Sequence, residues 1–254
     1  MRLFTSLLLA LILFSTLNIE ASQKRKVLFI GIDGTRADAL QQAHTPYIDS
    51  LFASPGLSTY NAWCAGITIS GPTWSSMLTG VWFNKHGVTN NNYTGSDFNT
   101  YPYFTTLAKQ LKPNLYCAEV CEWPPLIDDV YNDNFNLRLH VPDGQGATTC
   151  ATAATVLAND SIDFMFVYFD QVDLTGHSSG FSPTNPAYIT AIENVDSCVG
   201  VVLDALHNRA HYADEDWLVI LMTDHGGIGT GHGGNTDQER QIWWIASGND
   251  LQNY

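Results

Sequence analysis

The sequence is poor in positively charged side chains. Its 254 residues include 11 lysines and arginines against 25 aspartates and glutamates, which gives a formal net charge of −14 at pH 7. A surface that grips a nucleic acid duplex needs clustered cations to neutralise the phosphates. The composition therefore argues against a nucleic acid duplex as partner. It is compatible with a small anionic substrate, provided that metal ions rather than lysine and arginine hold the anion.

A hydrophobic run long enough to span a membrane is also missing. The most apolar segment, Leu3–Leu17, has 15 residues, whereas a spanning helix needs about 20. Arg2 precedes this segment and the small residues Ala21 and Ser22 follow it, which is typical of a cleaved signal peptide at residues 1–22. We therefore expect a secreted or extracytoplasmic protein with no stable membrane span after cleavage.

Internal repeats, low-complexity tracts and linkers are absent as well. We therefore expect residues 23–254 to form a single catalytic domain, because a chain of this length is ordinary for one α/β domain. Hydrophobic residues make up 45% of the sequence, which is enough for a substantial core.

The cysteines show no metal-binding motif, because they lack the C-x-x-C spacing of a zinc knuckle. In a secreted chain they allow up to two disulfides with one thiol left over, and their spacing does not fix the pairing. Sequons at Asn92 and Asn159 mark glycosylation sites if the host is eukaryotic. The five cysteines are Cys64, Cys117, Cys121, Cys150 and Cys198.

Five short apolar runs predict the strands of a mostly parallel sheet. They are continuous rather than alternating, as strands covered on both faces are. Pro186–Arg209 has apolar residues every three or four positions, which predicts a long amphipathic helix. Alternating strands and helices predict a three-layer α/β/α fold. The five runs are Lys26–Ile32, Leu115–Cys121, Phe164–Asp170, Trp217–Thr223 and Gln241–Ser247.

Acidic and imidazole side chains follow three of these runs. Ligands of open α/β sheets bind outside the carboxyl ends of the strands. Acids and imidazoles placed independently for local structural reasons would scatter over both edges of the sheet, so this shared placement predicts one site. The glycines around the last of these residues let backbone and substrate approach closely. The residues are Asp33, Asp173, His177, Asp224, His225 and His232.

Each of these residues alone also has an ordinary explanation, as a helix cap, a surface pair, a turn or a loop residue. Together, three carboxylates and three imidazoles suit two divalent ions, with Zn²⁺ the first choice. The charges balance, because two divalent cations offset three aspartates and one deprotonated hydroxyl. Two such ions would clamp the attacking and leaving oxygens of an in-line displacement.

Ser70 is the candidate nucleophile. It precedes Gly71 and Pro72 and a segment with a helical pattern, and proline is well placed near a helix start. The partial positive charge of a helix N-terminus stabilises an oxyanion, and a metal-bound hydroxyl would be ionised near neutral pH. The alternative is that Ser70 only caps this helix.

Seven segments carry a resemblance to a known family. GIDGTRAD, HTPYIDSL, SGPTWSSMLTG, NKHGVTNNN, DLTGH, TDHGG and GHGGNTDQER occur in the family's order, from about Lys26 to the C-terminus. By these segments the chain resembles the alkaline phosphatase superfamily, most closely its nucleotide pyrophosphatase/phosphodiesterase (type I phosphodiesterase) and phosphatase-like branch. The resemblance implies a parallel-rich sheet between helical layers.

The resemblance also implies a role for each candidate residue. Ser70 would be the phosphorylated nucleophile, and Asn91, or its neighbour Asn90, would hold the phosphoryl oxygens. Trp123 is a candidate wall residue that stacks on a substrate ring, with simple packing as an equally good alternative. The implied ligands of one ion are Asp33, Ser70, Asp224 and His225, and those of the other are Asp173, His177 and His232.

Three features depart from the family pattern. The phosphodiesterase branch usually has threonine as nucleophile and asparagine three residues later, where this chain has Ser70 and Thr73, and this puts diester preference in doubt. Sulfatases need an arginine four residues after the residue converted to formylglycine, where this chain has Trp74. Family members continue with a further helix after the last predicted strand, so the chain is either a fragment or a minimal form.

The predicted function is that of a secreted two-metal hydrolase of small phosphate esters, a nucleotide among the candidates. It would be either phosphodiesterase-like or a phosphomonoesterase, and Ser70 would form a covalent phosphoryl-enzyme intermediate. The alternatives are a sulfate ester hydrolase on the same scaffold and a non-catalytic secreted protein whose metals hold the fold. Arg36 and His86 also lie in the family motifs and are interpreted as structural.

Overall fold

The computed structural model describes residues 24–64, 66–127, 135–248 and 251 of the chain. The signal peptide predicted at residues 1–22 lies outside the described residues. Within these ranges, every helix is too short or too polar to cross a membrane. The described residues are organised around a seven-stranded sheet with the order β2-β7-β6-β1-β5-β3-β4.

All five predicted strands are present, with boundaries within two residues of the predicted ones. The sheet is mostly parallel, as predicted: β1 pairs in parallel with β5 and β6, and β3 pairs in parallel with β4 and β5. The last predicted strand, β7, runs antiparallel to both of its neighbours. The strands are β1 (Lys24–Ile32), β2 (Gly56–Trp63), β3 (Cys117–Cys121), β4 (Leu137–His140), β5 (Phe164–Phe169), β6 (Glu215–Met222) and β7 (Gln241–Ser247).

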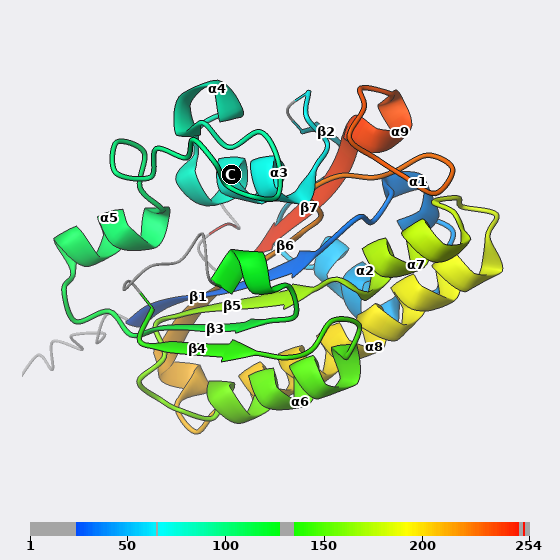
Figure 1. The fold of residues 1–254 in the computed structure, drawn as a ribbon. Helices are drawn as coiled ribbons and strands as arrows, with labels where there is room; N and C mark the ends of the chain where they lie inside the picture. The colour runs from blue at the N-terminus through cyan, green and yellow to red at the C-terminus, as the bar shows by residue number, and fades with distance from the viewer. Residues whose placement is uncertain (1–23, 65, 128–134, 249–250, 252–254) are drawn as a thin grey trace, which may run out of the picture.

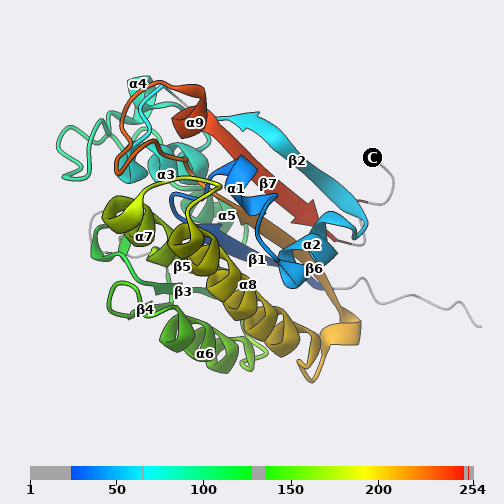
Figure 2. The ribbon, with the colours of Figure 1, turned by 90° about the vertical axis from the view of Figure 1, so that its right-hand side faces the viewer.

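Helices cover both faces of this sheet, which confirms the three-layer α/β/α fold. Figure 1 shows α3, α4 and α5 on one side and α6 and α8 on the other, and Figure 2 shows α8 lying along the sheet beside α6. The helices are α1 (Ala37–Leu40), α2 (Pro46–Phe52), α3 (Ser70–Thr79), α4 (Phe83–His86), α5 (Phe104–Leu111), α6 (Gly146–Leu157), α7 (Gln171–Ser179), α8 (Pro186–His207) and α9 (Asp237–Arg240).

The long helix α8 begins at the predicted proline. The side chain of Asn185 accepts a hydrogen bond from the backbone N–H of Ala187 and so caps the helix. Pro186 follows as the first helical residue, where its missing N–H costs nothing. The helix ends at His207, two residues before the predicted end at Arg209.

Strand β1 explains why the apolar runs are continuous. Its even-numbered residues Leu28, Ile30 and Ile32 belong to the core under α6 and α8. Phe29 points to the other face and packs against Trp74 of α3, with ring centroids 6.4 Å apart. Because both faces of the central strands are buried, every position along them favours an apolar residue.

The register of the central strands positions the site. Ile32 of β1 lies beside Phe169 of β5, and Gly31 lies beside Met222 of β6. The three strands therefore end together at one edge of the sheet, as the sequence predicts. The residues that follow them are delivered to the same place.

The opposite edge of the sheet holds a buried ion network. Glu215 at the start of β6 accepts hydrogen bonds from Nε and Nη2 of Arg209, both 2.8 Å long, and from the Trp217 indole. Lys26 of β1 lies 3.5 Å from Glu215 and donates to the carbonyl of Ile162. Burial alone would raise the pKa of Glu215, but these bonds and charges lower it to about 2.

We predict that Glu215→Gln destabilises the protein by about 3 kcal/mol at neutral pH, because it leaves two buried cations without their carboxylate. A depressed folded-state pKa gives stability that is complete above the unfolded pKa and is lost as the pH falls. The difference in the free energy of unfolding between wild type and variant should therefore shrink by about half between pH 6 and pH 3. Urea unfolding at both pH values measures it, and a pH-independent difference would contradict this assignment.

Candidate metal centre and active site

The predicted site residues converge at the carboxyl edge of the sheet. Ligand atoms of Asp33, Asp224 and His225 lie within 4.8 Å of one another, and those of Asp173, His225 and His232 form a second such group. His225 thus belongs to both groups, whereas the sequence assigns it to one. His177 adjoins the second group, with its Nε2 atom 3.2 Å from Asp173 Oδ2 and 3.0 Å from His232 Nε2.

Two strand ends, one helix and one loop provide these residues. Asp33 follows β1, and Asp224 and His225 follow β6. Asp173 and His177 stand four residues apart on α7, so they share one face of that helix. His232 comes from the glycine-rich loop, and its ring stacks on that of His225 with centroids 3.9 Å apart.

A backbone carbonyl orients each imidazole. In all three rings the Nδ1 atom donates to that carbonyl, which leaves the Nε2 atom to face the site. This is how ligand histidines are usually held, because the bond fixes both tautomer and ring orientation. The bonds run from His177 to Thr230 (3.0 Å), from His225 to Gly226 (2.8 Å) and from His232 to Thr68 (2.6 Å).

The donor set fits cations. Burial and the neighbouring carboxylates of Asp224 and Asp173 raise the pKa of Asp33 well above its usual value, and burial also raises that of Asp224. Asp173 Oδ1 is buried without a hydrogen-bond partner. A bound cation would satisfy this oxygen and remove the repulsion between the three acids.

The pKa values of the imidazoles also fit a cation site. Burial and the neighbouring His225 lower the pKa of His232 to about 4, whereas the hydrogen bond to Asp173 raises that of His177 to about 9. Burial lowers the pKa of His225, but the surrounding carboxylates raise it overall. The Nδ1 atoms of His177 and His232 both donate to carbonyls, and their Nε2 atoms face each other at 3.0 Å. Two Nε2 atoms in this position need a proton or a metal ion near them.

Neutral donors outside the site orient Asp33. Its Oδ2 atom accepts from the Trp74 indole N–H at 3.0 Å and from the Tyr168 hydroxyl. The other oxygen, Oδ1, is left for the site and lies 3.4 Å from both Ser70 Oγ and His225 Nε2. The indole that stands where sulfatases need arginine therefore supports a ligand carboxylate.

Asp224 is held in the same way. The hydroxyl of Thr73 donates to its Oδ2 atom at 2.9 Å, and the backbone N–H of Gly34 donates to its Oδ1 atom at 3.2 Å. Gly34 has a positive φ of 65°, and a side chain there would collide with Asp173. This position therefore requires glycine for both reasons.

Ser70 is the first residue of α3, and Ile69 occupies the N-cap position. The Ser70 hydroxyl makes no capping bond. It lies 3.4 Å from Asp33 Oδ1 and 3.3 Å from His225 Nε2. The side chain therefore faces the first ligand group rather than its own helix, which argues against a purely capping role.

Asn91 is held against the start of α3. Its Oδ1 atom accepts from the backbone N–H of Gly71 at 2.8 Å, so its amide N–H₂ is the group left to face the pocket. A side chain at Gly71 would press on the Asn91 amide. Asn90 instead accepts from the backbone of Asn92 in a local turn. Of the two candidates, Asn91 lines the pocket.

The pocket around these residues has a volume of about 360 Å³. Trp123 forms part of its wall, and its ring stacks near Tyr168 with centroids 6.4 Å apart and planes inclined by 27°. Within the described residues, the side chains that line this pocket include no lysine or arginine. They are Asp33, Ser70, Asn91, Trp123, Asp143, Tyr168, Asp170, Asp173, Leu174, His177 and His232.

The sequence does not single out Asp170 and Glu122, two buried acids beside this pocket. Glu122 accepts from the backbone N–H of Asp170 at 2.9 Å and from the Thr149 hydroxyl at 2.7 Å. Burial and the nearby Glu122 raise the pKa of Asp170 to about 9. Both acids directly follow the cores of apolar strands, so the strand-end rule that found Asp33 applies equally to them.

Arg36 and His86, interpreted as structural, make contacts of that kind. Arg36 pairs with Asp38 and donates to the carbonyls of Phe181 and Gly227 at 3.0 and 3.2 Å. It thereby joins two loops beside the site. The buried His86 ring bonds to the Ser76 hydroxyl at 3.0 Å.

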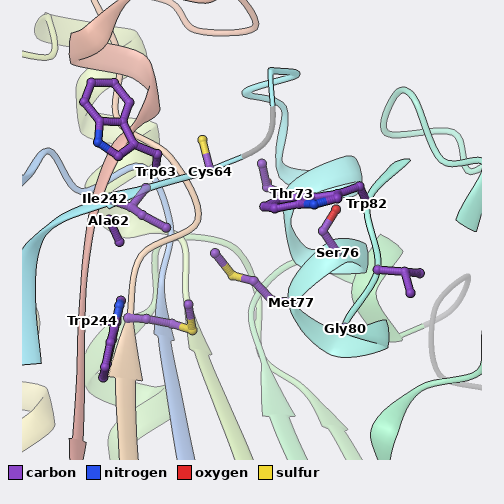
Figure 3. Close-up of a pocket in the computed structure, with 12 residues that line it drawn as sticks. Ala62, Trp63, Cys64, Thr73, Ser76, Met77, Gly80, Trp82, Ile242 and Trp244 are labelled. Atoms are coloured by element: carbon purple, nitrogen blue, oxygen red, sulfur yellow. The ribbon is translucent and has the colours of Figure 1, made fainter. Parts of the chain in front are cut away.

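A second, apolar pocket of about 280 Å³ lies on the other side of α3. Figure 3 shows Ile242 and Trp244 of the sheet on one side of it and Met77 and Ser76 of α3 on the other. Thr73 lines this pocket and also bonds to Asp224. Most of the predicted site residues line the polar pocket instead, and Asp224 and His225 are buried next to Asp33.

The fold and the two ligand groups are those of the alkaline phosphatase superfamily. A family model described as type I phosphodiesterase / nucleotide pyrophosphatase matches residues 27–238. The chain therefore belongs to the type I phosphodiesterase/nucleotide pyrophosphatase family, which confirms the resemblance inferred from the seven segments.

Individual relatives are distant. The rat ectonucleotide pyrophosphatase/phosphodiesterase family member 7 is 22% identical over 229 residues, covering 82% of this chain and 51% of the relative. The chain spans about half the length of the curated relatives that it matches first.

Solved structures share the fold. An inactive variant of murine ectonucleotide pyrophosphatase/phosphodiesterase 5 in complex with AMP has a TM-score of 0.62 at 20% identity, covering 80% of this chain and 57% of that one. A 2-O GAG sulfatase has a TM-score of 0.71 at 16% identity, covering 89% and 65%.

We predict that Tyr168→Phe weakens Zn²⁺ binding by about 10- to 100-fold, because Asp33 loses a donor that fixes its orientation. Competition with a chromophoric chelator measures this affinity without relying on turnover. Trp74→Phe, which removes the other donor, should act in the same direction.

The exposed Trp82 offers a matched control for the indole variant. Trp82→Phe should leave Zn²⁺ affinity unchanged. Equal affinities in wild type, Tyr168→Phe and Trp74→Phe would rule out orientation of Asp33 by these two donors.

Proposed function

We propose that the chain is a secreted two-metal hydrolase of phosphate esters with Ser70 as its nucleophile. The observation that carries this proposal is the position of the Ser70 hydroxyl, 3.4 Å from Asp33 Oδ1 and 3.3 Å from His225 Nε2. An activated nucleophile needs to stand beside the group that lowers its pKa. Membership of the type I phosphodiesterase family supports the same chemistry.

The two ligand groups define which residues would hold ions. Asp33, Asp224, His225 and Ser70 would hold one, and Asp173, His177 and His232 would hold the other, with Zn²⁺ the expected metal. Bound ions would supply the positive charge that lowers the pKa of the serine hydroxyl and offsets charge on the phosphoryl oxygens.

Ser70 Oγ would attack phosphorus in line, and the ester oxygen would leave on the opposite side. This forms a covalent phosphoserine, which water then hydrolyses. The N-terminal turn of α3 presents its backbone dipole to the same oxygens. The Asn91 amide, held through Gly71, would donate to a phosphoryl oxygen.

The substrate would be a small phosphate ester, with a nucleotide as one candidate. Trp123 would form an apolar wall for its organic group. The murine relative described above was solved with AMP, which supports a nucleotide without establishing it for this chain. Residues 23–254 would form the catalytic domain after cleavage of the signal peptide, and the exposed Asn92 and Asn159 would be available for glycosylation.

We predict that Ser70→Ala lowers kcat for phosphate esters by at least about 1000-fold, because it removes the nucleophile. Rates for p-nitrophenyl phosphate and bis(p-nitrophenyl) phosphate should be measured side by side with Zn²⁺ supplied. A large excess of monoester over diester activity would remove the phosphodiesterase interpretation while keeping the hydrolase.

The same preparation separates the alternatives. An unmodified serine at residue 70 by mass spectrometry excludes the formylglycine chemistry of sulfatases. Zn²⁺ bound without turnover of either ester, and without any effect of Ser70→Ala, would instead identify a non-catalytic protein whose metals hold the fold.

Asn91→Ala should lower kcat/KM by roughly 10- to 1000-fold, the range for loss of one oxyanion donor. Asn90→Ala is the matched control. Among the contacts described, the Asn90 side chain makes a hydrogen bond only within its own turn. Steady-state kinetics of both variants, with the ester that the wild type hydrolyses faster, shows which asparagine contributes. A larger loss in the Asn90 variant would reverse the assignment.

A further inference from the structure

Two of the five cysteines face each other between α6 and α8. Cys150 of α6 and Cys198 of α8 are both buried and belong to the same core cluster. Their thiols are close enough for each to shift the pKa of the other. Cys198 Sγ also lies 3.6 Å from the position that a Cβ on Gly146 would take, one helical turn before Cys150. Cys198 thus sits directly over the face of α6 that carries Cys150.

The remaining cysteines lack this geometry. Cys117 and Cys121 stand four residues apart on β3, about 13 Å at the rise of a strand, which exceeds the separation of about 7 Å that a disulfide can bridge. Both belong to the core on the α3 side of the sheet, whereas Cys150 and Cys198 belong to the core on the α8 side. Cys64 lines the apolar pocket next to α3.

We propose that Cys150 and Cys198 are a disulfide-forming site that links α6 to α8 once the chain enters an oxidising compartment. The proposal rests on the secretion part of the proposed function, because disulfides persist outside the reducing cytosol. It does not depend on the hydrolase chemistry.

The bond forms by exchange with a disulfide oxidant such as glutathione disulfide. The Cys150 thiolate attacks one sulfur of the oxidant and releases the first thiolate, which leaves a mixed disulfide on Cys150. Cys198 then loses its proton and attacks the Cys150 sulfur, which releases the second thiolate. Two protein thiols are oxidised and one oxidant disulfide is reduced to two thiols.

The order of attack follows from the environment of the two thiols. Interaction with the Cys198 thiol lowers the pKa of Cys150 to about 7, so its thiolate is available near neutral pH. The same contact raises the pKa of Cys198. Cys150 is therefore the attacking thiol and Cys198 the resolving thiol.

The proposed disulfide would stabilise one wall of the polar pocket. The backbone N–H of Gly144, which lies just before α6, donates to Asp170 at 2.8 Å, and Asp143 lines the pocket. The chain enclosed between the two cysteines contains β5 and α7, which carry Asp170 and Asp173. Fixing α6 on α8 therefore holds the segment that begins this wall.

Thiol counting tests the proposal on the purified full-length protein without reducing agent. After equilibration with glutathione disulfide, free thiols are alkylated in denaturant and the protein is digested for mass spectrometry. We expect three alkylated cysteines, Cys64, Cys117 and Cys121, together with a linked peptide that contains Cys150 and Cys198. Five alkylated cysteines under these conditions, or a linked peptide of different composition, would overturn the proposal.

Variants give a second readout. Cys150→Ala should raise the count of free thiols from three to four, whereas Cys64→Ala should lower it to two and keep the linked peptide. Reduction of the wild type should lower its Tm on the order of 10 °C, because the link constrains the unfolded chain. The Tm of Cys150→Ala should not respond to reduction, and an equal response in both proteins would also overturn the proposal.

Ser70→Ala separates this proposal from the hydrolase assignment. That variant should form the linked peptide as wild type does while losing activity. A missing link in an active enzyme would therefore refute only the disulfide, and a linked but inactive wild type would refute only the proposed chemistry.

Discussion

The approach of three aspartates, Asp33, Asp173 and Asp224, is the constraint on which the site depends. Burial and the neighbouring carboxylates raise the pKa of Asp33 and Asp224, whereas the hydrogen bond from His177 and the other nearby imidazoles lower that of Asp173. A fold that placed them together for stability alone would have no reason to leave Asp173 Oδ1 buried without a hydrogen-bond partner. Divalent cations bound by these residues would replace the interactions with water that the carboxylates lose on burial.

The surroundings of the cluster are consistent with that requirement. Each imidazole is held through Nδ1 by a backbone carbonyl. Asp33 Oδ2 and both oxygens of Asp224 accept hydrogen bonds from neutral donors. These bonds fix the direction of the ligand atoms without adding positive charge. The site is therefore organised before an ion arrives, and little reorganisation is needed when one binds.

The sequence predicts the central strands and the convergence of the candidate site residues at one edge of the sheet, because both follow from burial and from the direction of parallel strands. It misses β2, which is half-exposed at the edge of the sheet and has no continuous apolar run, and β4, which has four residues. The antiparallel direction of β7 is likewise invisible in a local pattern.

Ligand grouping is harder to predict from sequence than ligand identity. The family resemblance assigns His225 to one ion, whereas the structure places it in both ligand groups. The pairing of Asp170 with Glu122 is missed for a similar reason: it depends on the distance between β3 and β5, which the chain order alone does not give. The thiol pair between α6 and α8 is hidden in the same way.

The lining of the polar pocket has an electrostatic consequence. Its charged side chains among the described residues are acids and imidazoles, with no lysine or arginine. Cations held by these residues would therefore be the source of attraction for a phosphate group, and the empty pocket would repel one. Binding of a phosphate group would then depend on the supply of metal ions, because the pocket without bound cations repels anions.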